Sequence, residues 1–199
     1  MPKIITLAHQ KGGVGKSTLA FNLAHKFKDH VKTAVVDIDP QGTMIQISPM
    51  IVGYEVLTKP KDIKDILKMD YDVIFVDTPP YLSSLLANLI KYSDLIIVPT
   101  KAGIADLMAI RSTIDMLKEA KAEKKALIVF NMIKPNTNLT DEIKTMATKY
   151  GIDISKTMIS DLVAFTRSLV NNGLEKSSNK TAENQLDELT REVLQKINN

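Results

Sequence analysis

Short apolar runs alternate along the chain with longer amphipathic segments, and this alternation predicts an α/β fold. The predicted strands are short and rich in β-branched residues. They span Lys3–Ala8, Thr33–Asp37, Val73–Asp77, Leu95–Pro99 and Ala126–Phe130, with weaker candidates at Tyr54–Leu57 and Thr157–Ile159. Strands separated by helices form parallel sheets that are covered on both faces. We therefore expect three layers, with a twisted, mainly parallel sheet between two layers of helices.

Apolar residues at helical spacing predict the helices of the outer layers. These helices span Ser17–Lys28, Lys61–Lys68, Ser83–Lys91, Ile104–Lys121, Asp141–Tyr150 and Ala182–Ile197. A long irregular, mobile region is expected at Thr43–Lys59, and a polar loop at Glu175–Lys180. The chain has 199 residues, is 44% hydrophobic and contains no internal repeat, which is typical of one domain with a sizeable core.

The most specific motif is Lys-Gly-Gly-Val-Gly-Lys-Ser-Thr, which lies between the first predicted strand and the first helix. Its glycines lack Cβ atoms, so the backbone can adopt positive φ and turn its N–H groups toward an anion. Lys16 would reach the β- and γ-phosphates and Ser17 would ligate Mg²⁺, at the positive end of a helix. The general phosphate-loop pattern has glycine at Gln10, and this chain adds a second lysine, Lys11. The motif predicts nucleotide binding by Lys11, Gly12, Gly13, Val14, Gly15, Lys16, Ser17 and Thr18.

Acidic residues end two of the predicted strands. Asp37 ends the second strand and is followed by Asp39, and Asp77 ends Val73–Asp77. Ligands of open parallel sheets bind at the carboxyl ends of the strands, where Asp77 could hold Mg²⁺ through a water and Asp39 could polarise an attacking water. A single acid of this kind is more often a helix cap or turn residue. Two of them downstream of a phosphate loop favour a metal–phosphate site.

In these motifs the chain resembles the ParA/MinD group of deviant-Walker P-loop ATPases. Within that group it is similar to the short ParA-type partition ATPases, the ParF-like branch that has no N-terminal DNA-binding domain. The matching segments are Lys11–Thr18, Asp37–Gly42, Asp72–Pro80, Asp94–Pro99 and Ile159–Ile197. They run from one end of the chain to the other, so the resemblance implies a single P-loop ATPase domain over residues 1–199.

The resemblance also implies how the site works, with ATP and Mg²⁺ as cofactors. In this family the first lysine of the motif, here Lys11, crosses the interface of an ATP-sandwiched dimer and touches the partner's nucleotide. Asp39 positions the hydrolytic water, so Lys11, Lys16 and Asp39 are the expected catalytic residues. The two strand-end segments act as switches, and the residues expected to move are Asp37, Pro40, Gln41, Thr78 and Pro79.

Asn131 follows the strand Ala126–Phe130 and therefore lies at the carboxyl edge of the sheet. In the family an Asn at this point often recognises adenine through its amide, and Lys134–Thr137 would then help to wall the base pocket. Asn is also common where a strand exits into a turn. The sequence leaves both interpretations open.

Composition limits the function classes. The chain has no cysteine, which excludes disulfides, Cys-ligated zinc and thiolate-held clusters. Its 26 Lys and Arg against 23 Asp and Glu give a net charge of +3, less than a dedicated DNA-binding domain carries. The resemblance nevertheless implies non-specific DNA binding through Arg167, Lys176 and Lys180, although a basic residue of the ParF-like pattern is missing near Leu162. Four lysines near the end of one helix are a solvated face or a second DNA contact: Lys118, Lys121, Lys124 and Lys125.

The resemblance implies a partition ATPase of the cytoplasm and the nucleoid. It would form a homodimer with ATP, bind DNA non-specifically and hydrolyse ATP slowly until stimulated by a ParB-like or small centromere-binding protein. Its cargo could be a plasmid, a chromosome, a carboxysome or a chemoreceptor array. A MinD-like membrane-cycling ATPase is an alternative, but the last predicted helix has no aromatic residue and mixed charges, so we expect no membrane contact. A dethiobiotin-synthetase-like metabolic enzyme is a further alternative.

Overall fold

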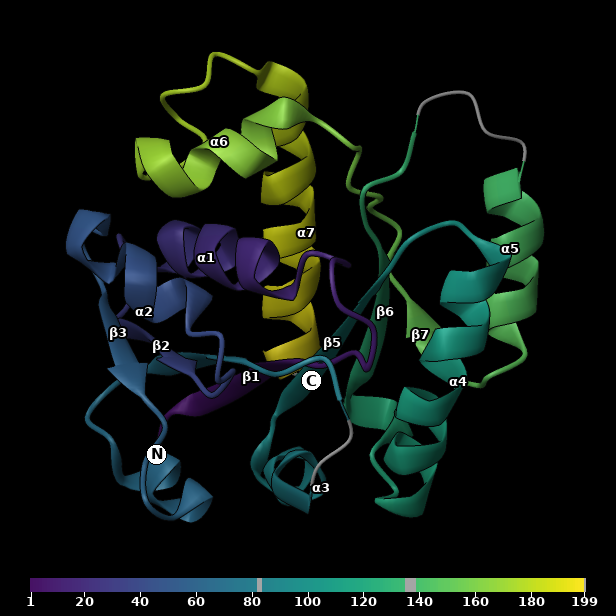
Figure 1. Ribbon diagram of the computed structural model, residues 1–199, viewed down its shortest axis with the longest axis horizontal. Helices are drawn as coiled ribbons and strands as arrows, with labels where there is room; N and C mark the ends of the chain where they lie inside the picture. Colours follow the sequence, from purple (N-terminus) through teal and green to yellow (C-terminus); the bar gives the residue numbers. More distant parts are fainter. Residues whose placement is uncertain (82–83, 135–138, 199) are drawn as a thin grey trace.

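A seven-stranded sheet forms the middle of the protein in the computed structural model, which describes residues 1–81, 84–134 and 139–198 (Figure 1). The strands are β1 (Lys3–Leu7), β2 (Thr33–Asp37), β3 (Glu55–Thr58), β4 (Val73–Asp77), β5 (Leu95–Thr100), β6 (Ala126–Phe130) and β7 (Asp153–Ile154). Their order across the sheet is β3-β2-β4-β1-β5-β6-β7, and neighbouring strands pair in parallel. The predicted parallel sheet is therefore confirmed.

Helices cover both faces of this sheet. The α-helices are α1 (Lys16–Phe27), α2 (Thr43–Ile47), α3 (Ser84–Tyr92), α4 (Ile104–Glu119), α5 (Leu139–Thr148), α6 (Val163–Asn171) and α7 (Lys180–Asn198). Three short 3₁₀ helices are η1 (Ser48–Met50), η2 (Ile63–Lys68) and η3 (Glu123–Lys125). Figure 1 shows α1, α6 and α7 on one face and α3, α4 and α5 on the other, so the three-layer prediction is confirmed.

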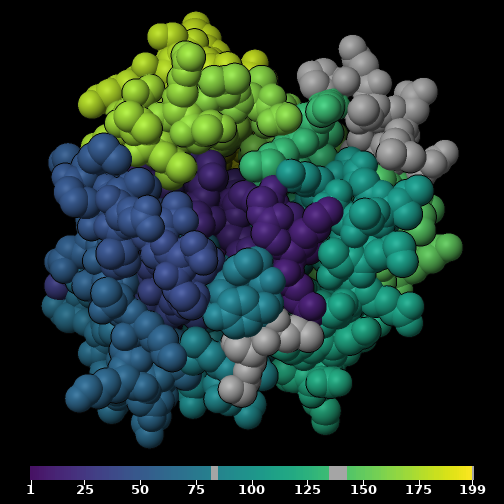
Figure 2. Space-filling view, in the orientation of Figure 1, coloured from purple at the N-terminus to yellow at the C-terminus, as the bar shows by residue number. Residues whose placement is uncertain are grey.

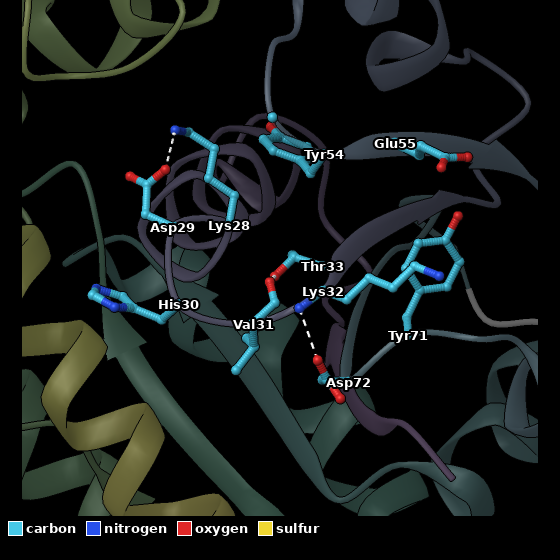
Figure 3. Close-up of a pocket in the computed structure, with 11 residues that line it drawn as sticks. Lys28, Asp29, His30, Val31, Lys32, Thr33, Tyr54, Glu55, Tyr71 and Asp72 are labelled. Carbon is cyan, nitrogen blue, oxygen red and sulfur yellow. Dashed lines mark hydrogen bonds and ion pairs between the residues drawn. The ribbon is translucent and has the colours of Figure 1, made fainter.

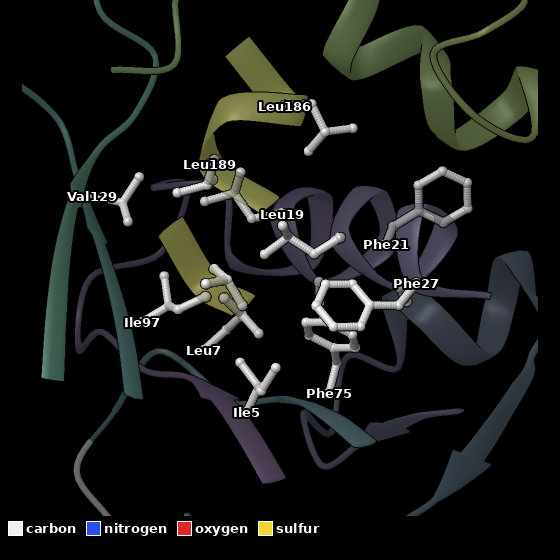
Figure 4. Close-up of a cluster of buried hydrophobic side chains, with 14 of the residues drawn as sticks. Ile5, Leu7, Leu19, Phe21, Phe27, Phe75, Ile97, Val129, Leu186 and Leu189 are labelled. Carbon is white, nitrogen blue, oxygen red and sulfur yellow. The ribbon is translucent and has the colours of Figure 1, made fainter. Parts of the chain in front are cut away.

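Alternate residues of each strand supply the two halves of the core. Ile5 and Leu7 of β1 point toward α1 and α7, whereas Ile4 packs with residues of β4 and η2 on the opposite face. Figure 4 shows side chains of α1 meeting those of the strands, and the rings of Phe27 and Phe75 pack edge to face at 5.3 Å between centroids. Complete burial of a side chain of this size stabilises the fold by roughly 2–3 kcal/mol.

The structure corrects several predicted elements. The region Thr43–Lys59 is not irregular: it contains α2 and η1, and β3 confirms the weaker strand predicted at Tyr54–Leu57. The short strand expected at Thr157–Ile159 lies earlier, at β7, because β7 is a two-residue edge strand with a single apolar residue and so has almost no pattern. The helix α6 was not predicted at all, and the predicted helix Lys61–Lys68 is the 3₁₀ helix η2. The predicted helix start at Ser83 lies outside the described residues.

Strand register brings the candidate catalytic residues to one edge of the sheet. Asp77 at the end of β4 pairs with Leu7 on one side and with Asp37 on the other. The glycine-rich loop leaves β1 at the same edge, and the backbone N–H of Asn131 donates to the carbonyl of Thr100 there at 2.8 Å. The carboxyl ends of β1, β2, β4, β5 and β6 therefore form one site, where parallel sheets bind ligands.

Candidate active site

The loop after β1 has the backbone that an anion site requires. Gly13 and Gly15 have φ values of 70° and 89°, and Gly15 precedes the first residue of α1. Gly12 has an ordinary φ, and a Cβ atom there would lie 3.7 Å from the Cβ of Pro80. Left-handed glycines followed by a helix N-terminus turn backbone N–H groups toward a common point, which is the geometry of a phosphate-binding loop. Figure 2 shows the purple N-terminal residues reaching the surface at the centre of this face.

Lys16 begins α1 and is the cation of this loop. Its side chain is buried, and its Nζ lies 3.4 Å from the carbonyl oxygen of Lys11. Burial lowers the pKa of Lys16, whereas the charges of Asp77 and Asp39 act in the opposite direction. The two acids favour the charged form of the buried ammonium of Lys16. The negative charge of bound phosphate oxygens would further offset the cost of burying this ammonium.

Asp77 is the acid best placed to take part in a metal site. It is completely buried, and neither carboxylate oxygen has a hydrogen-bond partner among the described residues. Burial raises the pKa of Asp77 to about 7, and the charge of Asp37 adds to the rise. The Ser17 hydroxyl approaches this carboxyl from the second residue of α1. Two unpaired carboxylate oxygens facing a hydroxyl fit Mg²⁺, which could be held by Ser17 directly and by Asp77 through a water.

Asp37 organises the first switch segment. Its Oδ1 accepts a hydrogen bond from the N–H of Asp39 at 3.0 Å, and its Oδ2 accepts from the N–H groups of Met44 at 2.9 Å and Ile45 at 3.2 Å. Burial raises the pKa of Asp37, and these three bonds act against the rise. The carboxylate of Asp37 therefore secures the N-terminus of α2 and leaves Asp39 as the half-exposed acid of the site.

Asp39 lies in a tight turn above the sheet edge. Its Oδ1 accepts from the N–H of Gln41 at 2.9 Å, and its carbonyl accepts from the N–H of Gly42 at 2.8 Å. Pro40 and Gln41 are exposed at the tip of this turn. The position of Asp39 depends on short-range hydrogen bonds within one loop, so a ligand could move it without disturbing the core.

The second predicted switch contacts both β1 and the glycine-rich loop. Thr78 is buried and donates from Oγ1 to the carbonyl of Leu7 at 2.6 Å. Pro79 is buried, and the next residue, Pro80, packs against Gly12. A shift of this segment would therefore change its contacts with the phosphate loop and with the end of β1.

Asn131 supports the phosphate loop, a role that sequence reasoning missed. Its side chain is buried, and Nδ2 donates to the carbonyl of Val14 at 2.8 Å. A Cβ atom at Gly15 would collide with the same amide, which together with the positive φ explains the need for glycine there. Residues 135–137 of the predicted base-pocket wall lie outside the described residues.

Lys11 is held by two residues that sequence reasoning did not single out. Its N–H donates to Nδ1 of His9 at 2.8 Å, and its Nζ lies 2.8 Å from Oδ1 of Asp106, in the first turn of α4. Burial lowers the pKa of His9 to about 4, with a further contribution from the Lys16 charge, so the imidazole is neutral near pH 7 and Nδ1 can accept. The side chain of Lys11 thus points toward α4 and remains 42% exposed.

A comparison with protein-family models decides the assignment. The model of the CobQ/CobB/MinD/ParA nucleotide binding domain matches residues 5–175, which include the loop, both switch segments and Asn131. The chain belongs to this family. It is a nucleotide-binding ATPase of the ParA/MinD superfamily, close to the ParA type.

Individual relatives agree with this assignment. Maintenance of carboxysome distribution protein A of Halothiobacillus neapolitanus is 25% identical, over 83% of each chain, and a ParA family protein of Mycoplasma pneumoniae is 25% identical over 98% of each. Among solved structures, a putative plasmid partition protein of Borrelia burgdorferi bound to AMPPNP has a TM-score of 0.75 at 22% identity, covering 96% of this chain and all of that one. An ATP complex of a Cyanothece McdA variant has a TM-score of 0.78 at 15% identity, covering 97% of this chain and 96% of that one. These structural likenesses support the fold.

The candidate DNA-binding residues of this ATPase lie on α6, on α7 and between these two helices. Arg167 is on α6, Lys176 follows α6, and Lys180 begins α7; all three are exposed. The second candidate group, formed by Lys118, Lys121, Lys124 and Lys125, lies at the C-terminal end of α4 and in η3. In this group the Nζ of Lys125 donates to the carbonyl of Ser93 at 3.0 Å. Lys118, Lys121, Lys124 and Lys125 are exposed as well, so both groups are available at the surface.

A separate hollow of about 670 Å³ lies at the amino ends of the strands, opposite the candidate active site (Figure 3). It is lined by Thr33 and Asp72, at the amino ends of β2 and β4, together with the turn after α1. Several of its charged groups already have partners: Lys28 pairs with Asp29, Lys32 contacts Asp70, and the carboxylate of Asp72 accepts from the N–H of Lys32 at 2.8 Å. The candidate active site therefore lies at the carboxyl ends of the strands and this hollow at their amino ends. The hollow is lined by none of the predicted phosphate-binding residues.

Proposed function

We propose that this ATPase is a ParA-type partition ATPase. In the presence of Mg²⁺ and ATP, two copies associate with the nucleotides between them, and the dimer binds DNA without sequence preference. Slow hydrolysis, accelerated by a ParB-like or small centromere-binding protein, releases the dimer and so moves or segregates plasmid or chromosomal DNA on the nucleoid. One ATPase domain over residues 1–199 carries these activities.

The presence of a second, half-exposed lysine, Lys11, beside a loop that already has its own cation is the observation that carries this proposal. The loop already has Lys16 to bind its own phosphates, and the side chain of Lys11 is directed toward α4 and left 42% exposed. A second lysine beside a phosphate loop, displayed at the surface, is suited to a nucleotide held by another subunit. Lys11 is thus the feature that favours a sandwich dimer over a metabolic enzyme in which the second lysine would serve a small substrate.

The remaining residues have conventional roles in phosphoryl transfer, which depends mostly on positioning and charge neutralisation. Lys16 would bind the phosphates, Ser17 would hold Mg²⁺ directly and Asp77 through a water, and Asp39 would orient the attacking water. Asn131 uses Nδ2 to fix the loop at Val14, which leaves Oδ1 as the atom that could accept from the adenine amino group. Mg²⁺ would supply neutralisation of the phosphate charge.

DNA binding would use the exposed residues Arg167, Lys176 and Lys180. Each subunit offers few contacts, and dimerisation doubles them on one rigid body, so linked weak sites gain affinity through effective concentration. This arrangement makes DNA binding depend on ATP.

A second candidate function, positioning of a protein cargo such as a carboxysome, is favoured by the similarity to a carboxysome distribution protein. It would use the same ATP and DNA cycle with a different partner. Membrane cycling is less well supported, because Leu186, Leu189 and Val193 of α7 are buried in the core and unavailable to a bilayer. Within the described part of the chain, no helix combines the length and apolar character needed to span a membrane.

We expect Met108→Glu to weaken ATP-dependent dimerisation by more than about tenfold while ATP binding is retained. Ile104 and Met108 lie one turn apart at the start of α4 and are 63% and 72% exposed, at the sheet edge that carries Lys11. Burying an unpaired carboxylate in an apolar interface costs several kcal/mol of association free energy. This cost weakens the affinity of the dimer by tenfold or more. Light scattering with Mg²⁺ and ATP in an Asp39→Ala background measures the dimer.

Leu194→Glu is the matched control, since it places the same acid at an exposed apolar position near the end of α7. It should leave the dimer intact. If the mass of the Asp39→Ala protein is unchanged by ATP at micromolar concentration, the sandwich-dimer proposal is wrong.

A further inference from the structure

We propose that Asp106 is an intramolecular latch for Lys11, which opposes dimerisation until ATP is bound by both subunits. The inference deepens the proposed function and rests on it for the role of Lys11 in trans. Its basis is the pairing of Lys11 Nζ with Asp106 Oδ1 at 2.8 Å within one chain. While the ammonium is held beside Asp106, the side chain of Lys11 is directed toward α4 of its own chain and not extended toward a second subunit.

The carboxylate of Asp106 is fixed in position. The side chain is only 11% exposed, and it belongs to the first turn of α4, where the helix N-terminus favours negative charge. The N–H of Asp106 donates to the carbonyl of Gly103 at 3.0 Å, and a Cβ atom at Gly103 would lie 2.6 Å from Asp106 Oδ2. Because Gly103 has no side chain, the carboxylate of Asp106 has room to lie where it pairs with Lys11.

The backbone of Lys11 is fixed as well. His9 is completely buried, and its Nδ1 accepts the N–H of Lys11 at 2.8 Å. With the main chain held by His9, only the side chain of Lys11 has to move when the latch opens. The switch thus reduces to a change in the side-chain conformation of one half-exposed lysine, which requires no unfolding.

Charge decides which partner Lys11 takes. In the free subunit the ammonium pairs with the single negative charge of Asp106, at 2.8 Å. The triphosphate of a facing subunit offers several negative charges, so it can displace one carboxylate, whereas a diphosphate offers fewer. The latch therefore raises the threshold for dimerisation and helps the protein to distinguish ATP from ADP. A half-exposed ion pair is modest in strength, so removing it should tighten the ATP-dependent dimer by on the order of three- to tenfold.

The test compares Asp106→Asn with Asp115→Asn, which makes the same change at an exposed position of the same helix. The first measurement is made without nucleotide, on the full chain. The rate at which acetic anhydride acetylates Lys11 is followed by peptide mass spectrometry. We expect a severalfold faster reaction in Asp106→Asn than in wild type or Asp115→Asn, because the amine is no longer held. Equal rates in all three proteins would overturn the latch, whether or not the protein dimerises. Thermal unfolding confirms that the variants are folded.

The second measurement is the dissociation constant of the dimer with Mg²⁺ and ATP, by light scattering or sedimentation. Tighter association of Asp106→Asn than of Asp115→Asn supports the latch. Unchanged or weaker association, together with faster acetylation, would show that Asp106 pairs with Lys11 without restraining it, and the autoinhibitory role would be wrong. Absence of any ATP-dependent dimer in wild type and both variants would instead overturn the proposed function, and the acetylation rates would still decide whether Lys11 is held.

Discussion

Lys16→Ala is expected to abolish tight ATP binding, with an increase in Kd of about a hundredfold or more. Lys16 is the buried cation at the start of α1, and its Nζ lies beside the carbonyl of Lys11 at the mouth of the loop. Truncating one partner of a buried charge pair costs about 3–5 kcal/mol, which corresponds to two or more orders of magnitude in affinity. Equilibrium titration with a fluorescent ATP analogue and Mg²⁺ measures the change.

Lys26→Ala is the control for this titration. It removes a lysine from the last turn of the same helix, where the amine pairs with Asp187 at 2.9 Å and lies far from the loop. It should bind ATP as wild type does. Wild-type affinity in Lys16→Ala would mean that the loop does not bind phosphate through this lysine.

Asp39→Ala is expected to retain ATP binding and to lose hydrolysis by about a hundredfold or more. Asp39 is the half-exposed acid of the site, and among the described residues its side chain bonds only within its own turn, to the N–H of Gln41. Its removal should therefore leave the loop, Asp37 and α2 in place while removing the group that orients water. Phosphate release at saturating ATP, measured beside the binding titration, separates the two effects.

Asp29→Ala provides the matched control for Asp39→Ala, because it removes an exposed acid beyond the end of α1 at the opposite edge of the sheet. Its turnover should equal that of wild type. Turnover by Asp39→Ala at the wild-type rate would show that another group orients the water.

The catalytic edge of the fold could be predicted from sequence because its signals are local. The glycine-rich loop, Ser17 and the strand-end acids Asp37 and Asp77 are each recognisable within a few residues, and parallel strands bring their carboxyl ends together. The roles of these residues remain proposals, but the structure places them where the sequence analysis expected. The core strands were also predictable, since β1, β2, β4, β5 and β6 are nearly continuous apolar runs.

Contacts between distant segments could not be predicted. Asp106 is 95 residues from Lys11, and Asn131 is 117 residues from Val14. Asp106 looks like an ordinary first-turn acid, and Asn131, which the sequence marked as a candidate for adenine recognition or a strand-exit turn, gives no local sign of its bond to Val14. Asp37 was expected to be a moving switch residue, and only the structure shows its three bonds to the backbone of its own loop.

The helix α6 and the strand β7 also escaped prediction, for physical reasons. The helix α6 is short, and its residues Val163 and Val170 are 63% and 69% exposed. The positions of its apolar residues therefore do not indicate which face of the helix is buried. The strand β7 adds two residues to an edge of the sheet and depends on pairing with β6. Tertiary packing determines both elements, and local propensity carries little information about them.

The central claim is that ATP makes this protein a DNA-binding dimer, and one titration tests it most directly. Fluorescence anisotropy of unrelated DNA duplexes is measured with Asp39→Ala protein, Mg²⁺ and either ATP or ADP, at two salt concentrations. We expect binding to every duplex with ATP and little with ADP, and a log affinity that falls with log salt by roughly 0.9 per phosphate contacted. Equal binding with both nucleotides, or no binding with ATP even at low salt, would contradict the claim.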